Sequence, residues 1–437
     1  MTSNSERFKC QCGGTYEFDI KTQMLKCPFC DSVISQEEYD AMAAKKLAED
    51  NIDVKDGGSR LDIDPETGEA FQEGQQETYI CKSCGGAITP ALTSISEKCP
   101  FCDSPIVLSG KVSGEAQPDV IIPFKFDQKK VQEAYTKHVT SKHFVPKSFN
   151  SEARKKEIQG IYVPFWLLSC KADGEVNLDC QKITTTRQAN QEITTHEHYD
   201  VYRKSHMEFT DLPADASKEM DDDLMDSIEP FDTAEALAFR TAYVSGFAAT
   251  KYDVGVEESY PRFEKRMKET FVKAVIDKSV KGYDKVDVVD SQIDFSDRSI
   301  KYAMFPVWII KNQWNGKDFI FAVNGQTGKL VGNLPTDWGR MFTSAGIWSV
   351  PAAAICIPAA KFLLENSEWT GAGIIGFLVA LVLSLIVHFV MVSGNTSVAD
   401  ATQADGYLDQ ESFSNAVERD KYSRTERQVR TISTSAK

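Results

Sequence analysis

Two long apolar runs dominate the C-terminal part of the chain. Residues 341–360 carry no charge, and residues 371–392 carry His388 as their one ionisable side chain. At a helical rise of about 1.5 Å per residue, each run is long enough to cross the roughly 30 Å hydrocarbon core of a bilayer. Two buried core helices are the alternative. The polar break at 361–370 favours a two-helix transmembrane hairpin, followed by a tail over residues 393–437.

The central region, residues 115–337, alternates helix-like and strand-like patterns, which predicts an α+β domain. Two blocks in it share one pattern. The first, IYVPFWLLSCKADGEVNLDC, and the second, YAMFPVWIIKNQWNGKDFIFAV, both read as a strand, a turn and a second strand. The turns are predicted at Asp173-Gly174 and Asn315-Gly316, and helical stretches around 128–139 and 261–278 precede the blocks. The second stretch has an apolar stripe along one face, formed by Phe263, Met267, Phe271 and Val275. A duplicated helix-plus-hairpin unit explains the likeness, and ordinary amphipathic patterning is the alternative.

The N-terminal part carries a repeated cysteine pattern. The heptapeptide KCPFCDS occurs at 26–32 and again at 98–104, each time at the same distance after CGG. Residues 79–104 have the spacing Cys-x2-Cys-x14-Cys-x2-Cys, and residues 7–31 have one residue fewer in the first pair. Such paired cysteines can enclose a metal ion tetrahedrally. The predicted ligands are Cys10, Cys12, Cys27, Cys30, Cys81, Cys84, Cys99 and Cys102.

These spacings predict two small zinc ribbons with one structural Zn²⁺ site each. A closed shell of four thiolates leaves no coordination position for water or substrate. Units of about 25 residues cannot fold on a hydrophobic core alone, so metal binding worth roughly 10–16 kcal/mol would supply their folding energy. Iron in a rubredoxin-like site uses the same ligands, so spacing alone leaves the metal open between zinc and iron.

The segment between the ribbons, residues 32–78, is expected to hold a short helix and an acidic linker. Ser35 and Glu38 form a capping-box pattern at the start of that helix. Residues 1–10 contain no apolar leader, and eight of the eleven cysteines fall in two tight clusters. Clustered metal-binding thiols indicate a reducing compartment. We therefore expect the ribbons, the central domain and the tail to lie in the cytoplasm of a multi-pass membrane protein.

The charge of the chain narrows the choice of partners. The net charge is -15 and the pI is about 5.0, and neither ribbon is strongly basic. Nucleic-acid binding requires clustered Lys and Arg, so protein contact is the favoured use of the ribbons. A membrane-held nucleic-acid-binding or transcription-related ribbon protein is the alternative. The sequence contains no nucleophile elbow or phosphate loop, so we do not expect an enzyme, although an iron-containing ribbon would suggest electron transfer.

Several phrases of the chain resemble one protein family. They are KCPFC, GIYVPFWLL, DDDLMDSIEPFD, AYVSGFAATKYDV, KYAMFPVWII and FAVNGQTGKLVGNLP. They are similar to the bacterial membrane-anchored TFIIB-type zinc-ribbon proteins of YdjG-like type, which are often mislabelled as primosomal helicases. The resemblance implies a cytosolic ribbon protein that is tethered to the lipid bilayer by its C-terminal hairpin. It also implies an adaptor or scaffold for membrane-associated proteins, in a phage-shock-type envelope-stress system.

Overall fold

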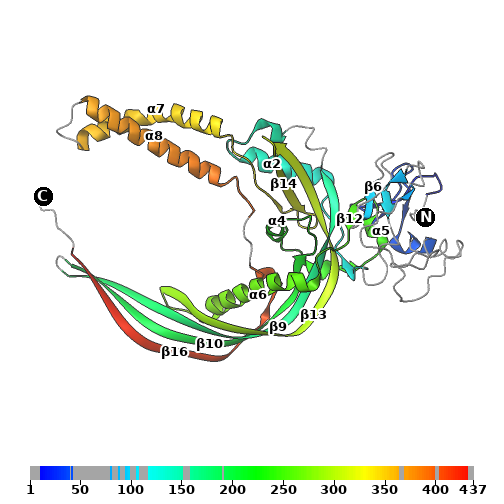
Figure 1. Ribbon diagram of the computed structural model, residues 1–437, viewed down its shortest axis with the longest axis horizontal. Coiled ribbons are helices and arrows are strands. Elements are labelled where there is room, and N and C mark those ends of the chain that lie inside the picture. Colours follow the sequence, from blue (N-terminus) through cyan, green and yellow to red (C-terminus); the bar gives the residue numbers. More distant parts are fainter. Residues whose placement is uncertain are drawn as a thin grey trace. The chain divides into compact units, whose positions relative to one another are not determined.

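The computed structural model divides the chain into two compact units (Figure 1). Unit 1 contains Met1–Val163, Lys218–Lys251 and Met304–Asp400, and unit 2 contains Pro164–Ser217, Tyr252–Ala303 and Ala401–Lys437. The region expected to form one α+β domain therefore contributes to both units. The structure describes residues 10–39, 41–42, 79–80, 87–88, 94–98, 105–107, 117–150, 158–188, 191–363, 369–398 and 403–431.

The first cysteine region folds as a small antiparallel sheet in unit 1. Its strands are β1 (Glu17–Asp19), β2 (Met24–Lys26) and β3 (Val33–Ile34), in that order. The helical turn that follows begins with the predicted capping box. The Glu38 amide donates to Ser35 Oγ over 3.1 Å, and the Ser35 amide donates to Glu38 Oε2 over 2.9 Å. The sequence prediction of a helix start at this point is confirmed.

The second cysteine region contributes short strands to unit 1. They are β4 (Tyr79–Ile80), β5 (Ala87–Ile88), β6 (Ser94–Lys98) and β7 (Pro105–Val107). Strands β4 and β5 pair with each other, whereas β6 pairs with both β7 and β12 (Ala248–Thr250). The pairing with β12 joins this region to the main sheet of unit 1.

The body of unit 1 is built around a mixed sheet and an aromatic core. Its further elements are β8 (Val120–Ile121), α2 (Gln128–Ser141), η3 (Lys147–Asn150), α4 (Asp222–Ser227), η4 (Thr233–Glu235), β11 (Leu237–Ala238), α5 (Thr241–Val244), β14 (Lys317–Asn324) and β15 (Leu330–Gly332). Phe124 stacks on Phe247 with ring centroids 4.4 Å apart, and both rings contact Tyr162 and Trp308 edge-on. This cluster fixes the sheet against the segment that holds the first cysteine region.

One of the two predicted turns is confirmed and the other is wrong. Strand β13 (Lys285–Trp314) turns into β14 at Asn315 and Gly316, whose φ angles of 50° and 72° suit a tight hairpin. Strand β9 (Gln159–Gln188), in contrast, continues through Asp173-Gly174 without a turn. A Cβ at Gly174 would lie 2.9 Å from both Phe271 and Ile293. Glycine is needed there for close packing, so the two blocks are not duplicates of one hairpin.

Unit 2 is a sheet of very long strands with one helix against it. Strand β10 (Gln191–Asp215) pairs antiparallel with β9 and with β16 (Leu408–Thr431), and Figure 1 shows β16 beside β10. A short 3-10 turn, η5 (Asp405–Tyr407), leads into β16. Helix α6 (Val256–Ser279) buries the predicted stripe of Phe263, Met267, Phe271 and Val275. The segment expected to be a tail therefore contains a strand of this sheet.

Two apolar helices follow β15 within unit 1. Helices α7 (Trp338–Leu363) and α8 (Trp369–Ser393) have mean hydropathies of 1.5 and 2.8 over their most apolar windows, and both are long enough to cross a membrane. They lie side by side (Figure 1), and most of their buried residues are small: Ala345, Ser349 and Ala353 on α7 and Ala372, Gly376, Ala380 and Ser384 on α8. A Cβ at Gly376 of α8 would lie 2.6 Å from the Cα of Ile357 of α7. Small residues at the contact allow this close approach.

Candidate metal centre

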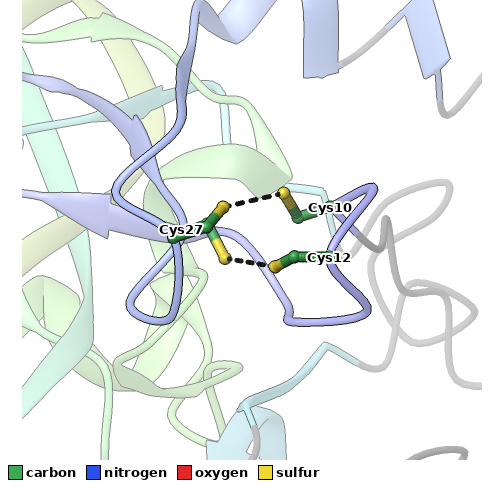
Figure 2. A group of neighbouring side chains, drawn as sticks. Cys10, Cys12 and Cys27 are labelled. Atoms are coloured by element: carbon green, nitrogen blue, oxygen red, sulfur yellow. Dashed lines mark hydrogen bonds between the residues drawn. The ribbon is translucent and has the colours of Figure 1, made fainter.

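The structure brings four of the predicted ligands together in the first cysteine region. The Sγ atoms of Cys10, Cys12, Cys27 and Cys30 all lie within 4.8 Å of one another. The Cys10 and Cys30 sulfurs are 3.4 Å apart, and those of Cys12 and Cys27 are 3.5 Å apart. Figure 2 shows the side chains of Cys10, Cys12 and Cys27 pointing towards one another. Four sulfurs around zinc at 2.3 Å would be about 3.8 Å apart, so the cluster fits an ion of this size.

Backbone turns position each pair of thiols. In the first turn, the Cys10 amide donates to the Gly14 carbonyl over 2.7 Å, and Gly13 adopts a φ of 91° that favours glycine. In the second turn, the Cys27 amide donates to the Ser32 carbonyl over 2.8 Å. A Cβ at Gly14 would lie 2.9 Å from Cys27 Sγ and 2.5 Å from the Phe29 ring. The two glycines therefore have different roles, one in the turn and one in leaving space for sulfur.

Ser32 adjusts the electrostatics of the cluster. Its Oγ lies 3.1 Å from Cys10 Sγ and 3.2 Å from Cys30 Sγ. Hydrogen bonds from Ser32, the Cys12 backbone and Tyr16 together lower the pKa of Cys10 to about 5, and Ser32 also lowers the pKa of Cys30. Although the Gly14 backbone acts to lower the pKa of Cys12, hydrogen bonds with Cys30 and Cys27 raise it to about 12. Thiolates are the form that binds metal, so Ser32 favours the ligand state of two of the four thiols.

The cluster lies at the surface of the first cysteine region, with two of its four thiols buried. Cys10 and Cys27 are buried in a small core with Tyr16, Leu25, Tyr39 and Ala242, whereas Cys12 and Cys30 are exposed. Phe29, between the last two ligands, is 80% exposed. Phe29 is therefore accessible at the surface beside the cluster.

The first cysteine region is attached to the body of unit 1 by direct hydrogen bonds. Ser245 Oγ donates to the Tyr16 carbonyl over 2.8 Å, and the Phe18 amide donates to the Ser245 carbonyl over 3.0 Å. The Phe18 ring contacts Tyr243 edge-on at 5.3 Å between centroids. The second cysteine region reaches the same segment, since Ser96 Oγ donates to the Val244 carbonyl over 3.1 Å. Residues 241–250 thus contact both regions.

The second predicted site lies outside the described residues. Cys81, Cys84, Cys99 and Cys102 belong to that part of the chain, so a second four-thiol site stays a prediction. The sequence prediction named neither Ser32, whose hydroxyl contacts two of the sulfurs, nor the exposed Phe29. Both belong to the repeated heptapeptide KCPFCDS, in which Phe101 and Ser104 are the matching residues. The repetition of the non-cysteine positions was the signal that could have identified them.

Among the other cysteines, Cys170 and Cys180 lie on the single strand β9 and both are buried. Burial raises the pKa of each thiol to about 11, which keeps them protonated near neutral pH. The Cys170 thiol lies 3.3 Å from the Met267 sulfur of α6. These two thiols belong to the core of unit 2 and not to a metal site.

Fold and site together define a multidomain α+β protein with a four-cysteine cluster and two apolar helices. Over 235 residues the chain is 32% identical to the "Uncharacterized protein YdjG" of Bacillus subtilis (strain 168), a match that spans 54% of this chain and 69% of the relative. The chain therefore belongs to the YdjG family. No protein-family model matches the sequence, and no solved structure matches it.

Proposed function

We propose that the protein is a membrane-tethered zinc-ribbon scaffold that binds other membrane-associated proteins in the cytoplasm. The observation that carries the proposal is the exposed Phe29 beside the four-thiol cluster. A closed four-thiolate site has no coordination position for a reacting molecule, which argues for a binding role and against a catalytic one. The metal would be Zn²⁺, held in both ribbons, and it would fix the turn that presents Phe29 and, by sequence repetition, Phe101.

The exposure of α7 and α8 supports a membrane tether. In their most apolar windows only 17% of α7 and 22% of α8 are buried. Core helices of a soluble protein would be mostly covered by other parts of the chain, whereas a bilayer covers an apolar surface from outside. Trp338 begins α7 and Trp369 begins α8, and both are exposed, as aromatic side chains at a membrane interface are.

The pairing of β16 with β10 supports two crossings. Strand β10 precedes the two apolar helices in the chain and β16 follows them, yet they pair antiparallel from Gln191 to Phe209. Hydrogen-bonded strands must lie on one side of the membrane, so the helix pair must leave and return. We assign that side to the cytoplasm, because thiolate sites are maintained in a reducing compartment. The family resemblance suggests an envelope-stress system as the setting, and this is part of the proposal.

The attachment of the first ribbon to unit 1 refines the scaffold hypothesis. Its surface would act together with residues 241–250 and not as a module on a free linker. A partner that touches both ribbons would gain affinity through the high effective concentration of the second contact. The doubled ribbon then serves to increase avidity for one assembly.

The test is affinity capture from detergent-solubilised membranes with full-length protein. The Phe29→Ser, Phe101→Ser double variant should lose the captured partners and keep its zinc, because neither side chain is a ligand. Val33→Ser is the matched control, since Val33 is also exposed in the first ribbon. Recovery of the same partners by the double variant would refute the ribbon-binding role. Salt-sensitive recovery of nucleic acid in place of proteins would favour the transcription-related alternative.

A further inference from the structure

The sheet of unit 2 has two open edges in the described residues. Strand β16 pairs with β10 alone, and β13 pairs with β9, β8 and β14. Strands β8 and β14 meet β13 in its C-terminal part, with β14 pairing at residues 307–314 and β8 near Met304. Each open edge presents backbone N–H and C=O groups that can pair with another strand.

The two edges have opposite charges on one face of the sheet. Ile293 faces α6, because a Cβ at Gly174 would touch both Ile293 and Phe271 of α6. Side chains alternate along a strand, so Asp290 and Asp294 lie on the face turned away from α6. Both are exposed. The β13 edge is therefore acidic on this face, with exposed Val288 beside the two carboxylates.

The β16 edge is basic on the same face. Arg203 contacts the Ser279 carbonyl of α6, whereas the neighbouring Tyr202 lies on the other face with Arg419 over its ring at 5.6 Å. Lys421 shares that face with Arg419 by strand alternation. After a bulge, Arg424 lies opposite His198, which shares the face of Tyr202. The exposed cations on this face are Arg419, Lys421, Arg424 and Arg430. Its acids are Glu426, which pairs with Arg424, and Asp409, which lies opposite Glu208 at the start of β16.

The directions of β13 and β16 also allow antiparallel pairing between two copies. Asp284 N–H bonds to the Gln181 carbonyl and Lys171 pairs with Asp297, so β13 is antiparallel to β9. Because β9, β10 and β16 are successively antiparallel, β13 and β16 run in opposite directions. A second copy in the same orientation would place its β16 antiparallel to β13. Antiparallel pairing is the more favourable mode, and copies held in one membrane would share one orientation.

We propose that the acidic β13 edge binds the basic β16 edge of a second copy of this chain, so that copies associate side by side through a continuous sheet. Charged side chains on an edge strand commonly prevent pairing, because like charges on two edges repel. That repulsion opposes pairing of β13 with β13 and of β16 with β16. Between β13 and β16 the charges are opposite, so it is absent. The contact joins different surfaces, so it can extend to a ring or a row of copies.

Charge reversal at each edge tests the proposal in full-length protein in detergent. One variant carries Asp290→Lys and Asp294→Lys, and the other carries Lys421→Glu and Arg430→Glu. We expect wild-type protein to form assemblies at low salt by light scattering, and each variant alone to have the mass of one chain. A mixture of the two variants should assemble again, because each supplies the edge that matches the other.

Lys317→Glu, at the exposed start of β14 in unit 1, is the matched control and should assemble like wild type. Zinc content and thermal unfolding of every variant report whether it is folded. Wild-type protein that is a single chain at low salt would overturn the proposal. Failure of the mixture to assemble would do the same, even if each variant alone is a single chain. Binding of the β16 edge to anionic vesicles, unchanged by the β13 variant, would assign that edge to lipid.

Discussion

Ser245 donates its hydroxyl to the backbone carbonyl of Tyr16 over 2.8 Å, and this bond joins the first cysteine region to the body of unit 1. Ser245 is 1% exposed. The attachment therefore depends on a buried hydrogen bond, and the loss of one partner would leave the Tyr16 carbonyl without its donor.

We expect Ser245→Ala to weaken this attachment by about 1 kcal/mol, the usual cost of one lost hydrogen bond. Hydrogen exchange should rise in β1 and β2, while zinc content stays the same. Ser141→Ala is a suitable control, because Ser141 Oγ donates only within its own helix and is exposed. Equal exchange rates in wild type and Ser245→Ala would show that other contacts hold the region in place.

We expect metal binding at the first site to depend on the space that Gly14 leaves beside Cys27. A Cβ there would press on Cys27 Sγ and the Phe29 ring, so Gly14→Ala should weaken zinc binding roughly 10- to 100-fold, as other changes beside metal ligands do. Elemental analysis should find two zinc ions per wild-type chain, and competition with a chelator gives the affinities. Gly255→Ala is the control, because a Cβ at Gly255 meets no atom within 4 Å. Equal affinities in both variants would contradict the steric argument, and iron in place of zinc would reopen electron transfer.

The ion pair of Arg203 and Asp420 predicts that the stability of unit 2 depends on pH. Arg203 Nη1 donates to Asp420 over 2.6 Å and Tyr283 Oη donates over 2.9 Å, which holds the pKa of Asp420 below its usual value. A carboxyl with a lowered folded pKa stabilises the protein above its unfolded pKa of about 3.9, and this stability is lost as the pH falls through the folded pKa.

Asp420→Asn should therefore destabilise β16 at neutral pH by about 1–2 kcal/mol, a value reduced because the carboxyl is 41% exposed. The difference from wild type should shrink as the pH falls below about 4, because the carboxyl of the unfolded chain takes up its proton there and that of the folded protein at a lower pH. Denaturant unfolding at several pH values measures both effects, with Glu411→Gln as an exposed control on the same strand. A difference that is constant with pH would assign the loss to packing.

The contact between α7 and α8 predicts opposite outcomes for two glycines of one helix. Gly376→Val should separate the helices, because its side chain would meet the backbone of Ile357, whereas Gly373→Val should be tolerated because nothing lies within 4 Å. The two changes alter helix propensity equally, so the comparison isolates the contact. Thermal unfolding in detergent should show a lower midpoint for Gly376→Val alone. Equal midpoints would mean that the helices do not pack in this way.

The sequence predicted those features that depend on local spacing. Paired cysteines bring their own sulfurs together in a tight turn, so the clustering of Cys10, Cys12, Cys27 and Cys30 followed from spacing. The apolar stripe of α6 followed from its period of 3.6 residues. The capping box at Ser35 also followed from local spacing, because its two hydrogen bonds join residues that are three positions apart.

Features that depend on distant contacts were missed or wrong. The Asp173-Gly174 pair suggested a turn, but the glycine is explained by the approach of Phe271 from α6. Strand β16 lacks the apolar alternation of a half-buried strand, because most of it is exposed and backbone pairing with β10 orders it. The attachment of Phe18 to Ser245 uses backbone groups, which every residue carries, so it leaves no pattern in the sequence.

The position of β16 after the apolar helices imposes an order on biosynthesis. Strand β10 ends at Asp215 and β16 begins at Leu408, so the ribosome starts β16 roughly 190 residues after it finishes β10. At about 5–20 residues per second, the edge of β10 would wait on the order of 10–40 s for its partner. In the proposed topology β16 reaches β10 only after both helices have been inserted and the chain has returned. Completion of the sheet would then mark a correctly inserted protein, and a nascent chain with a stalled or inverted helix would keep an open edge for chaperones and proteases to detect.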